Sequence, residues 1–313
     1  MMGGQFSRLL RFCAVNGRWI LVFSLVVGLL SETLANIVKP HIEALIALLL
    51  FTTCLRVGPR QMLGAMREIK ANLIFTVVLQ VLLPVTIVVI YWIGDFHNPL
   101  WLALILLTSA PAISGSPHLV ALLGFDPTST LRQLIIGTAL LPFTIIPVFV
   151  FMPEIGGLPD IIMASVRLLA VILGAAALAF IIRYSLMKHP GQKELEKIDG
   201  VSTILLSIMV LGLMAAIHSE ISDDPLNLLM TLFVAISANF GLQIITTLVL
   251  ARSRFSEYAV PMGLIAGNRN IALFMTALAV TKTQPLLLFI ACYQIPMYLT
   301  PILMRRFYKK WGH

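Results

Sequence analysis

Two long apolar stretches of this chain are interrupted in the middle by residues that do not favour a continuous helix. The interruptions are residues 111–117 (PAISGSP) and residues 267–270 (GNRN). Irregular backbone is not tolerated in contact with lipid hydrocarbon, and it persists only where it is buried in protein or lines a watery cavity. A matched pair of interrupted segments in the two halves of a membrane protein is typical of a substrate or ion site near the midplane. The pattern therefore predicts a secondary transporter.

The composition agrees with a membrane protein, because 59% of the 313 residues are hydrophobic and only 12% are charged. Apolar stretches of about 17–25 residues, each long enough to cross a bilayer core, recur along the whole chain. We expect an all-α polytopic protein without a soluble domain or a cleavable signal peptide. The predicted spans are residues 19–37, 41–56, 71–93, 100–122, 132–151, 160–183, 200–218, 226–251, 258–281 and 285–305.

The net charge of +8 is distributed unevenly between the connections. If the N-terminus is cytoplasmic, most basic residues fall on that side, while acidic residues such as Asp95, Glu220, Asp223 and Asp224 fall on the other. The positive-inside rule then places both termini in the cytoplasm. We expect a multi-pass protein of the plasma membrane, in bacteria the inner membrane, with membrane lipid as a partner and no nucleic acid.

A pair of prolines with the same spacing occurs in each half of the chain. Pro142 and Pro147 lie late in the fifth predicted span, and Pro296 and Pro301 lie at nearly the same offset in the tenth. The interruptions in the fourth and ninth spans are separated by a similar offset. These coincidences favour two repeats, residues 1–155 and 156–313. Because five spans is an odd number, the second repeat enters the bilayer inverted, as in many secondary transporters.

The interruptions also supply candidate binding residues. Half-helix N-termini carry partial positive charge and C-termini partial negative charge, so a broken helix offers sites for anions and cations. Ser114 and Ser116 in the first break, and Asn268 and Asn270 in the second, add hydrogen-bonding side chains. Arg269 is the sharpest candidate, because an ionised side chain near mid-span is costly and by default functional. The alternatives are a proline kink used only for packing, and an arginine that reaches the interface or binds free carbonyl groups in a purely structural role.

Few other ionisable groups lie within the predicted spans. His118 is a candidate relay residue, although a single histidine is more often structural. Arg167 is close enough to a span end to reach the interface. The aspartates and glutamates lie in connections or near span ends, and Cys13, Cys54 and Cys292 show no metal-ligand spacing. We expect no metal and no cofactor.

At the two breaks the chain resembles the bile acid:sodium symporter superfamily. Pro111 and Ser116 match the family's fourth-span pattern, whose closing asparagine is replaced by Pro117. Gly267 and Asn270 match its ninth-span pattern, but the sodium-binding glutamate is replaced by Ile265 and the glutamine four positions later by Arg269. Gln80, upstream of Pro84, resembles a family glutamine in the third span, and family hydroxyls of the fifth span fall near Thr138. The resemblance implies ten helices in two inverted five-helix repeats, with broken helices 4 and 9 crossing.

The departures from the family pattern bear on mechanism. Loss of the glutamate and gain of a guanidinium would remove both sodium sites, so we expect Arg269 to replace the ions and transport to be independent of sodium. The family fold implies a six-helix core that moves against a four-helix panel. Arg269 and half-helix N-termini favour a small organic anion as substrate.

Several alternatives stay open. The chain could be a sodium- or proton-coupled symporter of bile acid-like or other anions, or a related carrier of metalloid oxyanions or sulfur compounds. A channel and a receptor are also conceivable. We expect no enzyme, because the sequence shows no HExxH motif, no cysteine–histidine pair at suggestive spacing and no carboxylate pair within a span.

Overall fold

The computed structural model describes residues 2–65, 69–95, 98–152, 155–188, 190–278 and 286–311. Regular structure in these ranges is helical, and the one β-type pairing there is an isolated bridge between Ala112 and Arg269. The predicted all-α fold class is therefore confirmed for the described residues.

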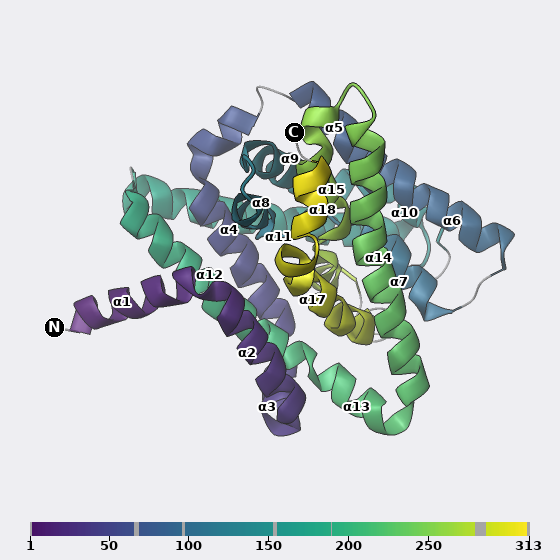
Figure 1. The fold of residues 1–313 in the computed structure, drawn as a ribbon, viewed down its shortest axis with the longest axis horizontal. Helices are drawn as coiled ribbons and strands as arrows, with labels where there is room; N and C mark the ends of the chain where they lie inside the picture. Colours follow the sequence, from purple (N-terminus) through teal and green to yellow (C-terminus); the bar gives the residue numbers. More distant parts are fainter. Residues whose placement is uncertain are drawn as a thin grey trace. The chain divides into compact units, whose positions relative to one another are not determined.

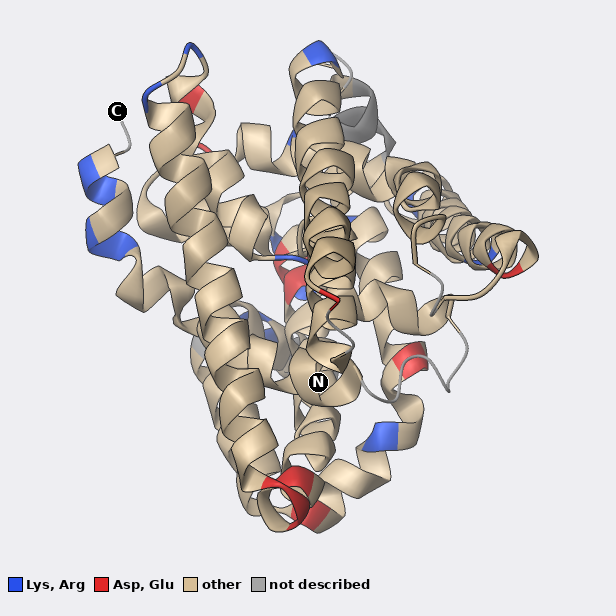
Figure 2. Ribbon diagram, turned by 90° about the vertical axis from the view of Figure 1, so that its right-hand side faces the viewer, with Lys and Arg blue, Asp and Glu red and all other residues tan. Residues whose placement is uncertain are grey.

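Six helical segments within the described ranges are long and apolar enough to cross a membrane. They are Glu32–Gly58, Ile69–Ile93, Leu158–Ser185, Gln192–Asp223, Pro225–Ala251 and Leu286–Leu303. A bent pair, Ser7–Val15 with Trp19–Leu30, passes the same test when taken together. Figure 2 shows long stretches of helix without a charged residue. These features indicate a polytopic membrane protein.

Helices occur in each of the ten predicted spans, but the structure divides some of them differently. The first predicted span is interrupted at Ser31, whose hydroxyl accepts a hydrogen bond from the Leu34 N–H at 3.5 Å and caps a new helix. That new helix runs into the segment Glu32–Gly58, which joins parts of the first and second predicted spans. Residues 279–285, at the junction of the ninth and tenth spans, lie outside the described ranges. Ten crossings and two inverted repeats remain predictions.

The contacts divide the chain into two compact units. Unit 1 comprises Met1–Met62 with Ala170–Pro225, and unit 2 comprises Leu63–Leu169 with Leu226–His313. Each unit takes segments from both predicted repeats, so the compact units and the predicted repeats are different divisions of the chain.

Unit 1 is built around one long helix, α12. Its elements are α1 (Met2–Val15), α2 (Gly17–Leu30), α3 (Glu32–Val38), η1 (Lys39–His41), α4 (Ile42–Ala65), the end of α11 (Leu158–Ser185), α12 (Gln192–Leu213) and α13 (Ala215–Asp223). Helices α1, α2 and α3 all pack on α12 (Figure 1). Two glycines of α12 allow this close approach, because a Cβ at Gly200 would collide with the Leu10 carbonyl and one at Gly212 would meet Val38.

Unit 2 contains the interrupted segments. Its elements are α5 (Ile69–Val77), η3 (Val78–Leu82), α6 (Leu83–Ile93), α7 (Pro99–Ser109), α8 (Ser116–Leu123), α9 (Thr128–Thr144), α10 (Ile146–Phe149), the start of α11, α14 (Pro225–Ala251), η4 (Ser256–Tyr258), α15 (Ala259–Gly267), η5 (Ile271–Thr276), α17 (Leu286–Leu303) and α18 (Arg305–Trp311). Every residue of α15 is buried, as expected for a helix that is apolar on all sides. Helix α15 therefore forms the centre of unit 2.

The packing of α1 on α12 can be tested with two glycine substitutions. Gly200→Ala should lower the melting temperature of the purified protein, because the added methyl meets backbone of α1 and overpacking costs about 1–3 kcal/mol. Gly174→Ala in α11 is the matched control, since a Cβ there meets nothing within 4 Å. Alanine is the better helix former by about 1 kcal/mol, so the control should keep or raise the melting temperature. Equal effects of the two substitutions would contradict the described contact.

Candidate functional site

Both interruptions anticipated from the sequence are present in the structure. Helix α7 ends at Ser109 and α8 begins at Ser116, with Ala110 in an extended conformation at ψ 151°. Helix α15 ends at Gly267, and the 3-10 helix η5 begins at Ile271. The chain thus leaves the helical conformation in the middle of two apolar segments.

The two unwound segments are hydrogen-bonded to each other. The Ile113 N–H donates to the Asn268 carbonyl at 3.0 Å, and the Asn270 N–H donates to the Pro111 carbonyl at 2.8 Å. These bonds flank the antiparallel bridge between Ala112 and Arg269. Backbone groups released by one break are thereby paired with groups released by the other. This pairing satisfies buried backbone that could not remain unpaired in an apolar environment.

Arg269 connects three backbone carbonyl groups, two of which lie at the ends of helices. Its Nε donates to the Ala266 carbonyl at 3.1 Å, Nη1 to the Ala110 carbonyl at 2.8 Å and Nη2 to the Leu79 carbonyl at 3.3 Å. Ala110 and Ala266 lie at the C-terminal ends of α7 and α15, where the helix dipole is negative. The side chain is 2% exposed, and it is the one buried charged side chain among the described residues. The guanidinium therefore serves as an internal cation where the two unwound segments meet, and we call this meeting point of residues 110–115 and 268–270 the crossing.

The third carbonyl, that of Leu79, has no helical partner because the segment from α5 to α6 is locally irregular. Residues Val78–Leu82 form a π-helical turn, in which the Leu83 N–H bonds to the Val78 carbonyl. The next donor in this register would be Pro84, which has no N–H. The Leu79 carbonyl consequently lacks its helical partner and accepts from Arg269. Such π turns often occur at functional sites.

A second polar network holds the other side of the break after α15. The Gly267 carbonyl accepts hydrogen bonds from the Asn239 amide and the Tyr293 hydroxyl. Gln243 Nε2 donates to Asn239 Oδ1 at 2.6 Å, and the Tyr308 hydroxyl donates to Gln243 Oε1 at 2.7 Å. All of these side chains are buried. None of them was predicted from the sequence, although the four-residue spacing of Asn239 and Gln243 places these two on one face of α14.

The predicted residues of the second break lie at the crossing. The Asn268 amide donates to the Leu264 carbonyl at 2.9 Å, and Asn268 Oδ1 accepts from Thr300 Oγ1 at 3.4 Å. Asn268 is fully buried, whereas Asn270 is half-buried and thus partly accessible. Asn268 is therefore engaged in internal contacts, and Asn270 is the more accessible of the two asparagines.

The predicted residues of the first break differ in accessibility. Ser114 is half-buried, whereas Ser116 is fully buried and its hydroxyl has no hydrogen-bond partner among the described residues. His118 lies two residues later in α8 and is exposed. Ser114 is thus the side chain of this break that a ligand can reach most directly.

Gln80 lies at the contact of η3 with α9. A Cβ at Gly137 would be 2.8 Å from Gln80 Nε2 and 3.7 Å from Gln133 Nε2, so both amides lie close to this glycine. Gln133 Nε2 donates to Thr76 Oγ1 at 2.9 Å. The amide oxygens of Gln80 and Gln133 are buried without a partner among the described residues. Thr138 is half-buried beside Gly137, and no described contact links it to the crossing.

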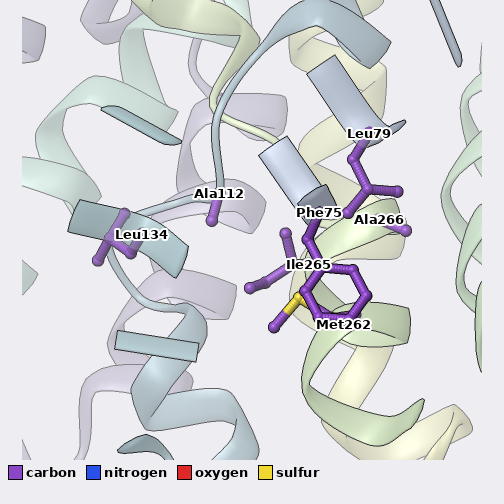
Figure 3. Close-up of a cluster of buried hydrophobic side chains, with 7 residues drawn as sticks. All are labelled: Phe75, Leu79, Ala112, Leu134, Met262, Ile265 and Ala266. Carbon is purple, nitrogen blue, oxygen red and sulfur yellow. The ribbon is translucent and has the colours of Figure 1, made fainter. Parts of the chain in front are cut away.

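An apolar cluster covers one side of the crossing. Figure 3 shows Ile265 among the side chains of this cluster, which come from α5, η3, the first break, α9 and α15. Its buried members are Phe75, Leu79, Ala112, Leu134, Met262, Ile265 and Ala266. Ile265 therefore contributes no oxygen ligand at a position next to the crossing.

A polar cavity of about 390 Å³ lies elsewhere in unit 2, at the starts of α9 and α15. Its polar lining consists of Asp126, Thr128, Ser129, Arg132, Ser256, Glu257 and Tyr258. Hydrogen bonds from the side chain and backbone of Thr128 lower the pKa of Asp126. None of the residues predicted to bind substrate lines this cavity, so it is separate from the predicted site.

Comparison with known protein families gives no match to this chain, and no curated protein matches it. Within the described ranges, no group of three or more His, Cys, Asp or Glu side chains is arranged to hold a metal ion.

The role of the guanidinium can be tested by substituting Arg269. Arg269→Met should strongly lower the melting temperature in detergent, because three charge-assisted hydrogen bonds are lost, each worth about 1.5–3 kcal/mol. Arg269→Lys should be intermediate, since a compact ammonium cannot reproduce the planar fork that reaches three carbonyls.

Arg167→Met is the matched control for this experiment. Arg167 is exposed on α11, so its loss should leave the melting temperature nearly unchanged. A stable Arg269→Met protein would contradict the structural role assigned to the guanidinium.

Proposed function

We propose that this protein is a secondary transporter that moves a small organic anion by alternating access, as a divergent relative of the bile acid:sodium symporters. The single observation that supports this proposal most strongly is the pairing of two unwound segments around a buried arginine. Paired breaks of this kind place helix ends and non-helical backbone at one point inside an apolar protein. The proposal includes ten membrane crossings in two inverted repeats, with both termini in the cytoplasm of a bacterial inner membrane.

The contacts of Arg269 support transport without sodium. A sodium ion at a helix break is held by hard oxygen ligands such as carbonyl groups. Here three such carbonyls already accept hydrogen bonds from the guanidinium. At position 265, where the family carries a carboxylate, an aliphatic side chain packs in the apolar cluster. A tethered cation in place of a diffusible one would keep the crossing assembled at all times.

The electrostatics of the crossing support an anionic substrate. The positive charge of Arg269 is buried, and no aspartate or glutamate among the described residues is buried with it. The polar side chains next to it that remain partly accessible, Ser114 and Asn270, can both donate hydrogen bonds. The start of α8 adds the positive end of a helix dipole. We propose that the substrate anion binds at Ser114 and Asn270 and is attracted by Arg269 behind them.

The proposal is tested by uptake into proteoliposomes. Labelled aliphatic carboxylates, sulfonates and a conjugated bile acid should be offered with an inward sodium gradient or with choline in its place. We expect saturable uptake of at least one anion at equal rates in both conditions. Uptake that requires sodium would refute the proposed role of Arg269 but would retain the transporter. Linear, non-saturable flux would indicate a channel and refute the carrier.

A double substitution tests whether the guanidinium of Arg269 takes the place of a sodium ion. Arg269→Gln alone should abolish uptake, because the carbonyls lose their cation. Combined with Ile265→Glu, which restores a carboxylate beside them, the same substitution should recover uptake only when sodium is present. Ile265→Gln with Arg269→Gln is the control of similar size without the charge, and it should remain inactive.

A further inference from the structure

The last helix of the chain has one strongly basic face. Helix α18 spans only Arg305–Trp311, yet four of its residues are cationic and exposed: Arg305, Arg306, Lys309 and Lys310. No salt bridge to these four side chains is present among the described residues. Figure 2 shows basic residues along the short helix that leads to the C-terminus. This face therefore carries positive charge that the described part of the protein does not neutralise.

The basic face lies where an apolar span ends. The candidate membrane span Leu286–Leu303 stops two residues before α18, and its last side chains, Ile302 and Leu303, are 63% and 56% exposed. Exposed apolar side chains followed at once by exposed cations are typical of the boundary between hydrocarbon and headgroups. Clusters of Lys and Arg directly beside a membrane span are attracted to anionic lipid.

A second cationic group joins this face from another part of unit 2. The Arg252 guanidinium, in the connection after α14, lies 5.0 Å from the centre of the Trp311 ring, and Lys310 Nζ lies 5.6 Å from the same ring. Tryptophan prefers the interfacial level of a bilayer. Arg252 therefore extends the basic face, and Trp311 gives it an interfacial side chain.

The opposite face of α18 is buried against the broken helices. Tyr308 is fully buried, and together with Met304 it packs with Val120 and Leu123 of α8 and with Val260 and Leu264 of α15. These are the half-helices that follow the first break and precede the second. Figure 1 shows α18 beside α15 and α17. A shift of α18 would therefore change the packing of both half-helices, α8 and α15.

A chain of hydrogen bonds leads from α18 to the second break. The Tyr308 hydroxyl donates to Gln243 Oε1, Gln243 Nε2 donates to Asn239 Oδ1, and Asn239 donates to the Gly267 carbonyl. Gly267 is directly followed by Asn268, whose carbonyl pairs with the first break. The basic helix and the crossing are thus joined both by packing and by a continuous polar network.

From these observations we infer that α18 binds the headgroups of anionic phospholipids and that this binding stabilises the crossing of the two broken helices. Lipid phosphates would pair with Arg305, Arg306, Lys309 and Lys310 on one face. Tyr308 on the other face is a positioning residue that transmits the fixed orientation of α18 to Gln243 and the break. The inference concerns a surface other than the proposed substrate site, and its test does not use transport.

The test compares the full-length protein in nanodiscs of phosphatidylcholine with nanodiscs that also contain phosphatidylglycerol. The readout is hydrogen–deuterium exchange of peptides that cover residues 305–311 and residues 264–273. We expect phosphatidylglycerol to slow exchange in both segments. Absence of any difference between the two lipids would overturn the inference.

Two variants separate lipid binding from its transmission. The four substitutions Arg305→Gln, Arg306→Gln, Lys309→Gln and Lys310→Gln together should remove the response of both segments to phosphatidylglycerol. Tyr308→Phe keeps the basic face but loses the hydrogen bond to Gln243, so residues 305–311 should still respond while residues 264–273 should not. A full response of both segments in Tyr308→Phe would refute transmission through the polar network.

Two controls address other causes. Replacing Lys70, Lys188, Lys193 and Lys197 by Gln removes the same charge at other positions and should leave the response intact. If this control loses the response as completely as the α18 variant, the effect is general electrostatics and the inference fails. Soluble glycerol phosphate added to phosphatidylcholine nanodiscs should have no effect. Full protection by it would assign α18 to a small soluble anion instead of the membrane.

Discussion

The crossing of the two broken helices depends on how backbone groups are satisfied away from water. Each break releases N–H and C=O groups that a continuous helix would pair internally. Two backbone hydrogen bonds between the segments pair some of them, and the Arg269 guanidinium accommodates three carbonyls that remain. An arginine suits this position because its planar fork presents five donors in fixed directions and its charge is delocalised. Without such a donor the two helix C-termini would bring partial negative charges together in an apolar interior.

The surroundings of the crossing divide into an apolar and a polar side. On one side, Ile265 and its neighbours exclude oxygen ligands from the position next to the arginine. On the other, Asn239, Tyr293 and Thr300 bind the backbone and side chain at Gly267 and Asn268. Fully satisfied networks of buried hydrogen bonds fix one conformation. A break fixed in this manner keeps its conformation while the surrounding helices move. Its exposure to either side of the membrane can then change without refolding, as the proposed alternating access requires.

The C-terminal helix α18 is connected to the same broken helices. Helix α18 lies against both half-helices, and its one fully buried side chain, Tyr308, enters the polar network. A short, basic helix has little reason to be stable alone, because helices of this length are marginal in water. Its order comes from tertiary packing, which is why the inferred binding of lipid to its basic face would act on α8 and α15. Helices α8, α15 and α18, which are remote in sequence, thereby form one packed group.

Much of the site could be predicted from local sequence. The interruptions at 111–117 and 267–270 follow from Pro, Gly and Asn within apolar stretches, since these residue types act on the conformation of their own segment. Arg269 could be predicted as a candidate for a similar reason, because a charged side chain within an apolar stretch is exceptional whatever its orientation. The all-α class followed from the length and hydropathy of the segments.

The sequence by itself thus determined where the helices break and which charge lies between them. Only the tertiary structure decided which atoms meet there: the carbonyls of Leu79 and Ala110 bound by Arg269, the side chains of Asn239 and Gln243 behind Gly267, and the exposed position of His118. The physical reason is that a proline or glycine changes the backbone of its own segment, whereas hydrogen-bond partners far apart in the chain are selected by packing. The π turn before Pro84 shows both effects. The nearby proline leaves the Leu79 carbonyl without a helical donor, and the distant Arg269 donates a hydrogen bond to it.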